Sequence, residues 1–303
     1  MMIKNMTIVG MGALGLLFGG LAIDNLGTEA VTYVLDEERF KSYRNRHFTI
    51  NGNEYKMNTI SRSDATPADL AIVAVKYNAL PSAIETIKNC VDEHTILLSL
   101  MNGIDSEEKL AENFGKERVL GTIAQGMDAM KFGDALTYAH TGELRIGVFD
   151  ENQKPLLEEV KEFFDRAKIP YTVDEDILHS LWGKFMLNVG VNQTCMVYNT
   201  NYAGAQNPGK ARNTMIAAMR EVQSLAAAEG IILTEDDVES YLRLLGTLCG
   251  TSLPSMAQDA KSHRPSEVEM FAGEVIRRSK KYGLTTPVNS FIYNEVKKIE
   301  STY

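Results

Sequence analysis

The stretch "MTIVGMGALGLLFGGLAIDNLGTEAVTYVLD" (residues 6–36) decides the fold of the first half of this chain. A β-branched strand leads into the pattern Gly10-x-Gly12-x-x-Gly15, apolar residues then recur at helical spacing, and a second apolar strand ends in Asp36. The glycines permit a tight turn and a close approach of the backbone, and the N-terminus of the following helix favours a pyrophosphate. The stretch therefore predicts a βαβ unit that binds a dinucleotide through the turn residues Gly10, Met11, Gly12, Ala13, Leu14 and Gly15.

The same stretch has a second interpretation, because Lys4 precedes a long uncharged run that could pass for a signal peptide or a short membrane span. The glycine spacing, and the helical recurrence of apolar residues up to Gly27, a suitable C-cap, favour a strand, a turn and a helix instead. We therefore expect no membrane partner for this chain.

The composition narrows the class of protein further. The chain of 303 residues carries a net charge of -9, with 44% hydrophobic and 23% charged residues, and this acidic balance argues against nucleic acid as the main partner. Three widely separated cysteines suit a reducing environment, and the five scattered histidines lack the spacing of metal ligands. The sequence therefore predicts a cytoplasmic globular protein without a metal site.

Strand and helix patterns alternate in the first half of the chain only. Apolar runs at 70–75 and 95–101 are separated by a helical segment, which is typical of a parallel sheet buried on both faces. From Asp174 onward the periodicity is helical, and the length suits two domains of ordinary size. We predict an α/β protein with a Rossmann-type dinucleotide-binding domain over 1–174, followed by an all-helical substrate domain over 175–303.

Two polar residues follow buried strands of the expected sheet. Lys76 follows the run at 70–75, and Asn102, which precedes Gly103, follows the run at 95–101. The carboxyl ends of parallel strands meet at one edge, where the glycine turn also lies and where open α/β sheets bind ligands. Either residue alone would pass as an ordinary strand-end polar residue, but together with the glycine turn they indicate a functional edge.

The segment "WGKFMLNVGVNQ" (residues 182–193) places Lys184, Asn188 and Asn192 four residues apart in an apolar setting. On an α-helix this spacing puts the three side chains on one face. A solvated stripe on a surface helix is the alternative, but such a stripe usually carries oppositely charged partners. One ammonium and two carboxamides suit a small ligand with carboxylate or hydroxyl groups, and Lys184 is the best candidate for a proton donor.

Ser255 and Glu267 stand out in a later segment, residues 251–275. From the pattern alone both have structural explanations. Ser255 suits a helix N-cap, and Glu267 suits the first turn of a helix that Pro265 would begin.

Together these motifs resemble the ketopantoate reductase (2-dehydropantoate 2-reductase) family over nearly the whole chain. The resemblance implies NADP(H) as the cofactor, Lys184 as the general acid, and Glu267 as the residue that orients the hydroxyl end of the substrate. It places Lys76 near cofactor and substrate, adds Asn102 and Glu267 to the cofactor contacts, and assigns substrate binding to Asn102, Asn188, Asn192 and Ser255. The matching segments are "GMGALG" (10–15), "VK" (75–76), "MNG" (101–103), "LWGKFMLNVGVN" (181–192) and "SMAQDAKSHRPSEVEMFAGEV" (255–275).

Two segments depart from that family. Its members commonly carry a basic residue after the second strand, which binds the 2′-phosphate of NADPH, whereas this chain has Asp36, Glu37 and Glu38 ahead of Arg39. An acid there normally binds the ribose hydroxyls of NAD, so NAD(H) stays open as the cofactor, with Asp36 and Arg39 as cofactor-binding residues. Tyr202 replaces part of a small polar segment and would reshape the substrate pocket.

The expected function is the reduction of 2-dehydropantoate to pantoate with NADPH, a step of pantothenate and coenzyme A biosynthesis. An NADH-dependent D-2-hydroxy acid dehydrogenase that acts on branched 2-keto acids is the nearest alternative. A non-catalytic dinucleotide-binding sensor is an alternative from another class, against which Lys184 and Glu267 count. The expected partner is a small 2-keto acid, and a homodimer stays open.

Overall fold

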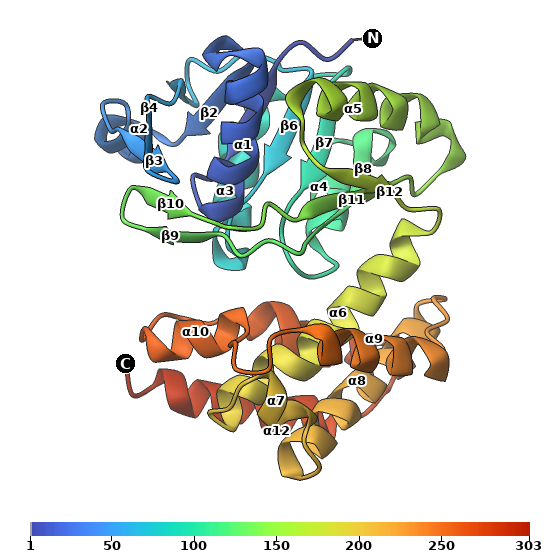
Figure 1. The fold of residues 1–303 in the computed structure, drawn as a ribbon. Helices are drawn as coiled ribbons and strands as arrows, with labels where there is room; N and C mark the ends of the chain where they lie inside the picture. The colour runs from blue at the N-terminus through green and yellow to red at the C-terminus, as the bar shows by residue number, and fades with distance from the viewer. Residues whose placement is uncertain (1) are drawn as a thin grey trace. The chain divides into compact units, whose positions relative to one another are not determined.

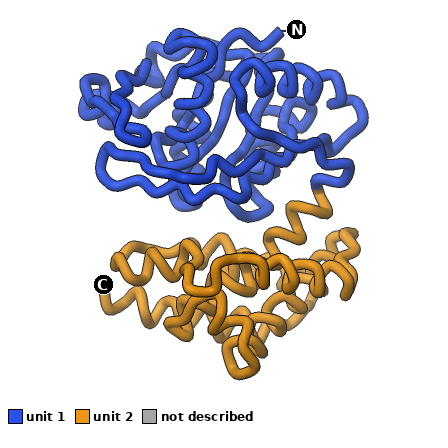
Figure 2. The backbone as a smooth tube through the Cα atoms, viewed as in Figure 1, with its two compact units in different colours: residues 1–177 blue, residues 178–303 orange. Residues whose placement is uncertain are grey.

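The structure, a computed structural model, describes residues 2–303 and divides into two compact units, residues 1–177 and 178–303 (Figure 2). The first unit is built around a mainly parallel sheet, and the second consists of helices (Figure 1). This confirms the predicted fold class, a Rossmann-type unit followed by a helical one. The predicted joint near residue 174 lies just before the division.

Eight strands form the large sheet of the first unit: β1 (Met6–Val9), β2 (Val31–Leu35), β5 (Thr59–Ser61), β6 (Leu70–Val73), β7 (Ile96–Ser99), β8 (Val119–Gln125), β11 (Glu143–Gly147) and β12 (Tyr171–Val173). Their order across the sheet is β12-β11-β8-β7-β6-β1-β2-β5. Neighbours are parallel except β8 and β11, which pair antiparallel. Since β1 lies between β2 and β6, the strand order reverses there, which is where open α/β sheets bind ligands.

Four helices cover the two faces of this sheet: α1 (Ala13–Leu26), α3 (Leu80–Ile87), α4 (Ser106–Phe114) and α5 (Lys154–Ala167) (Figure 1). α1 and α5 contribute Phe18 and Phe163 to one hydrophobic core. α3 and α4 contribute Leu80 and Leu110 to a second core on the opposite face. Because apolar side chains are buried on both faces, the strands and the residues that follow them are held firmly in place.

A smaller sheet in the first unit has the order β4-β3-β10-β9, formed by β3 (Phe48–Ile50), β4 (Asn53–Tyr55), β9 (Met130–Phe132) and β10 (Ala135–Thr137). β3 and β4 form a hairpin, in which Asn51 and Gly52 have φ values of 48° and 84°, as a two-residue turn with two left-handed residues requires. The sequence did not reveal β5, β9 or the helix α2 (Glu37–Tyr43). Segments this short do not display a period.

The second unit contains α6 (Ile177–Val197), α7 (Tyr202–Gln206), α8 (Lys210–Ala228), α9 (Glu235–Thr247), α10 (Ser255–Lys261), a π-helical turn (Glu269–Gly273), α11 (Glu274–Lys281) and α12 (Pro287–Glu300). Between 178 and 303 the structure has no strand, as predicted. α6 packs closely on its neighbours through glycines. A Cβ on Gly183 would lie 2.3 Å from Tyr241 Oη on α9, and one on Gly190 would lie 2.6 Å from Met219 Cγ on α8. Bulkier residues at these positions would push α6 away from both helices.

The structure contradicts the helix that was expected to begin at Pro265. Pro265 begins no helix, because the next residue is held in a non-helical segment: Ser266 N–H donates to Glu300 Oε1 at 2.7 Å, and Ser266 Oγ accepts from Val268 N–H at 3.3 Å. Gly283, where φ is 67°, lies between α11 and α12.

Candidate active site

The strand register of the first unit brings the ends of four parallel strands to one edge. Val9 pairs with Val34 and Val73, and Val73 in turn pairs with Ser99. The residues that follow these strands therefore leave the sheet at the same edge. They are the glycine turn after β1, Asp36 after β2, Lys76 after β6 and Asn102 after β7. The predicted site residues of the first unit are thus brought together.

The glycine turn has the shape that a dinucleotide requires. Gly10 has a φ of 111°, and a Cβ there would lie 2.3 Å from the Ala74 carbonyl oxygen, so only glycine fits. A Cβ on Gly15 would lie 2.0 Å from the carbonyl oxygen of Gly10. Gly12 is exposed, and a Cβ there would come no closer than 3.8 Å to a protein atom, so the protein itself leaves this space open.

The N-terminus of α1 also suits a phosphate. No side chain caps it, and its first turn contains no acidic residue. The N–H groups of this turn and the positive end of the helix dipole are therefore available to an anion. The residues present fit a dinucleotide at this place.

Asp36 and Arg39 interact with each other at the end of β2. Asp36 is the N-cap of α2: its Oδ1 accepts a hydrogen bond from Arg39 N–H at 2.8 Å, and its Oδ2 lies 3.5 Å from Arg39 Nε. The neighbouring Glu37 accepts a bond from Ser63 N–H at 3.4 Å. Asp36 and Glu37 thus each accept a hydrogen bond from another residue of the first unit, and both remain partly accessible to a ligand.

Sequence reasoning missed Arg62, a second arginine at this edge. β5 pairs in parallel with β2, with Ser61 opposite Leu35, and Arg62 N–H donates to the Leu35 carbonyl oxygen at 2.8 Å. The Arg62 side chain is exposed, and its guanidinium has no hydrogen-bond or ion-pair partner among residues 2–303. Since Leu35 directly precedes Asp36, only the strand pairing reveals that Arg62 lies at this place.

A buried hydrogen-bond chain holds the loop that carries Asn102. Met101 N–H donates to Ser99 Oγ at 3.3 Å, and the Ser99 hydroxyl donates to Ser106 Oγ at 2.9 Å. The Ser106 hydroxyl then donates to Glu107 Oε2 at 2.7 Å. Burial of the Glu107 carboxyl raises its pKa to about 7. Asn102 is half-buried, and its carboxamide has no hydrogen-bond partner in the part of the chain that the structure describes.

Lys184, Asn188 and Asn192 share one face of α6, since all three lie within this regular helix at intervals of four residues. Lys184 and Asn188 are half-buried, and Asn192 is 6% exposed. The carboxamides of Asn188 and Asn192 have no hydrogen-bond partner between residues 2 and 303. The polar atoms of both carboxamides remain accessible, so a ligand can supply their hydrogen bonds.

Ser255 is not the N-cap that its pattern suggested. Pro254 occupies the N-cap position of α10, without a side-chain cap, and Ser255 is the first helical residue. The Ser255 side chain is exposed, and its hydroxyl has no hydrogen-bond partner among the described residues. The loop before it is joined to α7 by a bond from Tyr202 N–H to the Ser252 carbonyl oxygen at 3.2 Å.

Glu267 does not lie in the first turn of a helix, as its pattern suggested. It occupies a bend two residues before the start of the π-helical turn, and its carbonyl oxygen accepts bonds from Met270 N–H and Phe271 N–H at 3.0 and 3.2 Å. The Glu267 residue is half-buried. Its carboxylate therefore belongs to an irregular segment whose shape depends on contacts with other helices.

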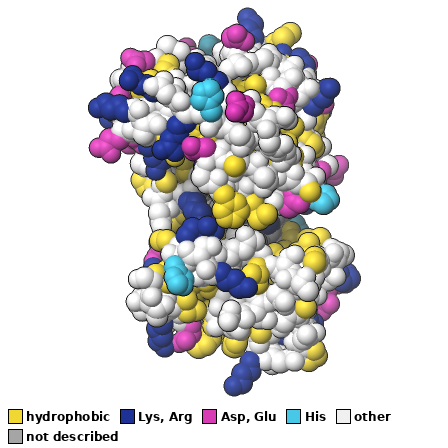
Figure 3. Space-filling model, turned by 60° about the vertical axis from the view of Figure 1, so that its left-hand side comes forward, with side chains coloured by type: hydrophobic (Ala, Val, Ile, Leu, Met, Phe, Trp, Pro, Cys, Tyr) yellow, Lys and Arg dark blue, Asp and Glu magenta, His cyan; other side chains and the backbone are white. Residues whose placement is uncertain are grey.

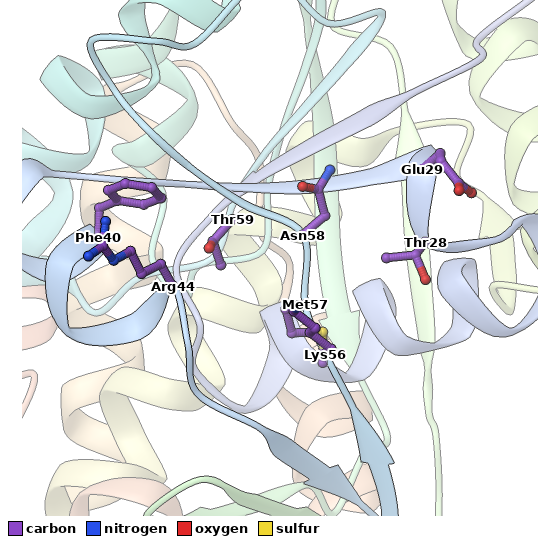
Figure 4. A pocket seen from close by; sticks show the side chains of 8 residues that line it. All are labelled: Thr28, Glu29, Phe40, Arg44, Lys56, Met57, Asn58 and Thr59. Atoms are coloured by element: carbon purple, nitrogen blue, oxygen red, sulfur yellow. The ribbon is translucent and has the colours of Figure 1, made fainter.

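A pocket of about 420 Å³ lies elsewhere on the first unit (Figure 4). Phe40 comes from α2 and Arg44 directly follows this helix; residues 56–58 come from the segment between β4 and β5, and Thr59 begins β5. The lining residues are Thr28, Glu29, Phe40, Arg44, Lys56, Met57, Asn58 and Thr59, and none of them is a predicted site residue.

Two other kinds of binding feature are absent from residues 2–303. No group of three or more His, Cys, Asp or Glu side chains there is placed to hold a metal ion. In the same range no helix combines the length and the apolar character needed to cross a bilayer. On the face of the first unit drawn in Figure 3, acidic and basic side chains are intermingled.

Comparison with known proteins identifies the family. Models of "Ketopantoate reductase PanE/ApbA" and of its C-terminal part match residues 6–151 and 176–300. The 2-dehydropantoate 2-reductase of Pyrococcus horikoshii is 29% identical over 299 residues, covering 97% of each chain. Two solved structures share the fold over 98% of this chain and 99% of theirs: D-mandelate dehydrogenase in complex with NADH, with TM-score 0.86 and 22% identity, and a dimeric ketopantoate reductase from Staphylococcus aureus, with TM-score 0.80 and 21% identity. The chain therefore belongs to the ketopantoate reductase family of oxidoreductases.

Proposed function

We propose that this chain reduces 2-dehydropantoate to pantoate with NADPH. One observation carries the proposal: the side chains of Asn102, Asn188, Asn192 and Ser255 all lack a hydrogen-bond partner among residues 2–303. Unpaired carboxamides and a hydroxyl complement the carboxylate, keto and hydroxyl groups of such a substrate. Family membership supports the type of reaction, and the name of the Pyrococcus relative supports the substrate.

The residues of the first unit hold the cofactor. The glycine turn and the N-terminus of α1 bind the pyrophosphate, and Lys76 contacts the cofactor nearby. Arg39 and Arg62 bind the 2′-phosphate, because a guanidinium makes charge-assisted hydrogen bonds to phosphate oxygens. When bound, NADPH supplies the hydride that reduces the keto carbon.

The residues of the second unit complete the chemistry. The Lys184 ammonium donates a proton to the keto oxygen, which becomes the alcohol oxygen as the carbon receives the hydride. Before that transfer the same ammonium stabilises the negative charge that develops on the oxygen. Asn188, Asn192 and Ser255 bind the substrate, and the Glu267 carboxylate accepts a hydrogen bond from its hydroxyl end.

Reduction of other branched 2-keto acids with NADH is the second candidate. The observation that favours it is Asp36, whose side chain is 40% exposed at the end of β2 and is followed by Glu37 and Glu38. A carboxylate at this position binds ribose hydroxyls and repels a 2′-phosphate. The structural relative that binds NADH supports this candidate too.

The deciding experiment follows the loss of reduced-nicotinamide absorbance in assays that combine NADPH or NADH with 2-dehydropantoate or 2-ketoisovalerate. We expect the highest kcat/KM for NADPH with 2-dehydropantoate. A highest value for NADH with 2-ketoisovalerate would instead assign the second candidate. No turnover with any pair, together with binding of either cofactor, would favour the sensor.

The role of Lys184 has a separate test. Lys184→Ala should lower kcat by about 100- to 10,000-fold, which is the usual contribution of a general acid. Lys280→Ala, which removes an exposed lysine from α11, serves as the matched control and should leave kcat unchanged. Near wild-type turnover by Lys184→Ala would refute this mechanism.

A further inference from the structure

The segment after Glu267 contains a single π-helical turn, Glu269–Gly273. Gly273 N–H donates to the Val268 carbonyl oxygen at 2.9 Å, a bond that spans five residues instead of four. In a regular α-helix that oxygen would accept from Ala272 N–H. The extra residue leaves Ala272 N–H without its helical acceptor, and such bulges frequently lie at functional sites.

Gln193 supplies the missing acceptor from a distant part of the chain. Its Oε1 accepts a hydrogen bond from Ala272 N–H at 3.0 Å, across 79 residues of sequence. Its Nε2 donates to the Val189 carbonyl oxygen of its own helix, α6, at 2.8 Å. Gln193 is fully buried, so both ends of this carboxamide are used inside the protein. A carboxamide offers both an acceptor and a donor at any pH, whereas a carboxyl group of the same length offers a donor only when it is protonated.

Apolar packing joins the same two elements. The rings of Phe185 on α6 and Phe271 in the π-helical turn have centroids 6.4 Å apart, and both residues are fully buried. Phe185 directly follows Lys184, and Gln193 directly follows Asn192. The helix that carries the proposed acid is therefore bound, at both ends of its functional stripe, to the turn that follows Glu267.

We propose that Gln193 is a positioning residue that keeps this turn π-helical and thereby places Glu267 relative to Lys184. The inference rests on the catalytic roles proposed above. Without an acceptor at position 193, the turn regains regular pairing if Ala272 N–H bonds the Val268 oxygen. That change shifts the register by one residue, and one residue of an α-helix corresponds to a rotation of about 100°. The Glu267 side chain would then point in another direction, whereas the position of Lys184 on α6 would not change.

The test is a double-mutant cycle of Gln193→Met and Glu267→Ala, read as kcat/KM for 2-dehydropantoate. Methionine matches the length of glutamine but offers no strong acceptor. Gln193→Met alone should lower kcat/KM by about 10- to 100-fold, the usual effect of a small displacement of a reacting group. In the Glu267→Ala background, Gln193→Met should lower kcat/KM by less than about 3-fold, because the Glu267 carboxylate that it would displace is already absent.

Two matched variants complete the design. Thr194→Val alters the adjacent buried residue of α6, whose hydroxyl has no partner within the described chain, and should leave kcat/KM unchanged. Gln193→Glu can restore both bonds when its carboxyl is protonated, as burial favours. We expect it to exceed Gln193→Met in activity at pH 6, with the advantage lost toward pH 8. If Gln193→Met does not fold, the activity of Gln193→Glu relative to the wild type provides the test, because this ratio should be higher at pH 6 than at pH 8.

Three results would contradict, in turn, the positioning role of Gln193, the role of its hydrogen bond to Ala272, and the catalytic role of Glu267. If Gln193→Met has the same effect in both backgrounds, or no effect, the positioning role is refuted. If Gln193→Glu shows no pH-dependent advantage over Gln193→Met, the hydrogen bond to Ala272 is not what matters. If Glu267→Ala alone keeps wild-type kcat/KM, the catalytic role of Glu267 fails, which is a failure of the proposed function.

Discussion

Arg62 bears directly on the choice of cofactor, because it extends from the strand beside β2 and its guanidinium has no partner among residues 2–303. Arg62→Ala should raise the KM for NADPH by about 10- to 150-fold, since a hydrogen bond to a charged group contributes about 1.5–3 kcal/mol. The KM for NADH, which has no 2′-phosphate, should not change. The matched control is Arg44→Ala in the pocket of Figure 4, which should affect neither KM. Equal effects on both cofactors would contradict a role in 2′-phosphate binding.

Glu107 makes stability depend on pH. Burial raises its pKa from 4.5 to about 7, so the folded chain retains a proton that the unfolded chain loses between these values. The contribution of this group to stability is therefore complete below about pH 4.5 and is lost as the pH rises to about 7. At 1.36 kcal/mol per pKa unit the loss is about 3 kcal/mol.

Glu107→Gln isolates this effect, because the amide keeps the shape and does not ionise. The free energy of unfolding in urea, measured at pH 5 and pH 7.5, should fall more for the wild type than for Glu107→Gln. Glu112→Gln, an exposed substitution on the same helix, should behave as the wild type. A wild type and a Glu107→Gln variant with parallel pH profiles would show that Glu107 is not protonated in the folded chain.

At the scale of elements, the glycines of α1 divide into those that the fold needs and one that a ligand needs. A Cβ on Gly19 would lie 2.0 Å from Tyr33 Oη, whose hydroxyl donates to the Gly15 carbonyl oxygen, so Gly19→Ala should destabilise the chain by about 1–3 kcal/mol. The Cβ of Gly12→Ala would come no closer than 3.8 Å to a protein atom, so the free energy of unfolding should not change. This substitution should nevertheless raise the KM for NADPH, since the Cβ enters the space left for the pyrophosphate.

The measurements are urea unfolding and steady-state kinetics on both variants. Gly19→Ala should have a lowered free energy of unfolding and, at low temperature, a normal KM for NADPH. Gly12→Ala should have a normal free energy of unfolding and a raised KM for NADPH. If Gly12→Ala bound NADPH normally, the open space at the turn would not be a binding site.

The sequence predicts those elements whose structure is set by neighbouring residues. It does not predict those whose structure depends on contacts with residues far away in the chain. The strand, turn and helix around Gly10 follow from residues within one short stretch, and the stripe from Lys184 to Asn192 follows from helical spacing alone. Arg62 could not be placed, because β5 has three residues and its position depends on pairing with β2. The turn after Glu267 could not be foreseen either, since its shape depends on Gln193, 79 residues before Ala272.

At the scale of the whole molecule, the first unit has the parts of an independent domain. Both hydrophobic cores that line its sheet consist of residues within 1–177, and so do the glycine turn, Arg39 and Arg62. The last residue of this unit, Ile177, packs against the large sheet. Ile177 fills the space beside two glycines of the sheet, where a Cβ on either Gly121 or Gly147 would lie 2.6 Å from it. Ile177 is 1% exposed in the intact chain.

This packing predicts where the chain can be cut. A fragment of residues 1–177 should unfold cooperatively in urea, and NADPH should raise its Tm, because a ligand that binds only the folded state stabilises it. A fragment of residues 1–174 should be less stable by about 1.5–3 kcal/mol, the usual value of one buried isoleucine. The fragment 1–177 with Ile177→Ala is the control and should resemble the shorter fragment. Equal stability of 1–174 and 1–177 would mean that Ile177 does not close the sheet, and a Tm of 1–177 that NADPH does not raise would mean that the first unit alone does not bind the cofactor.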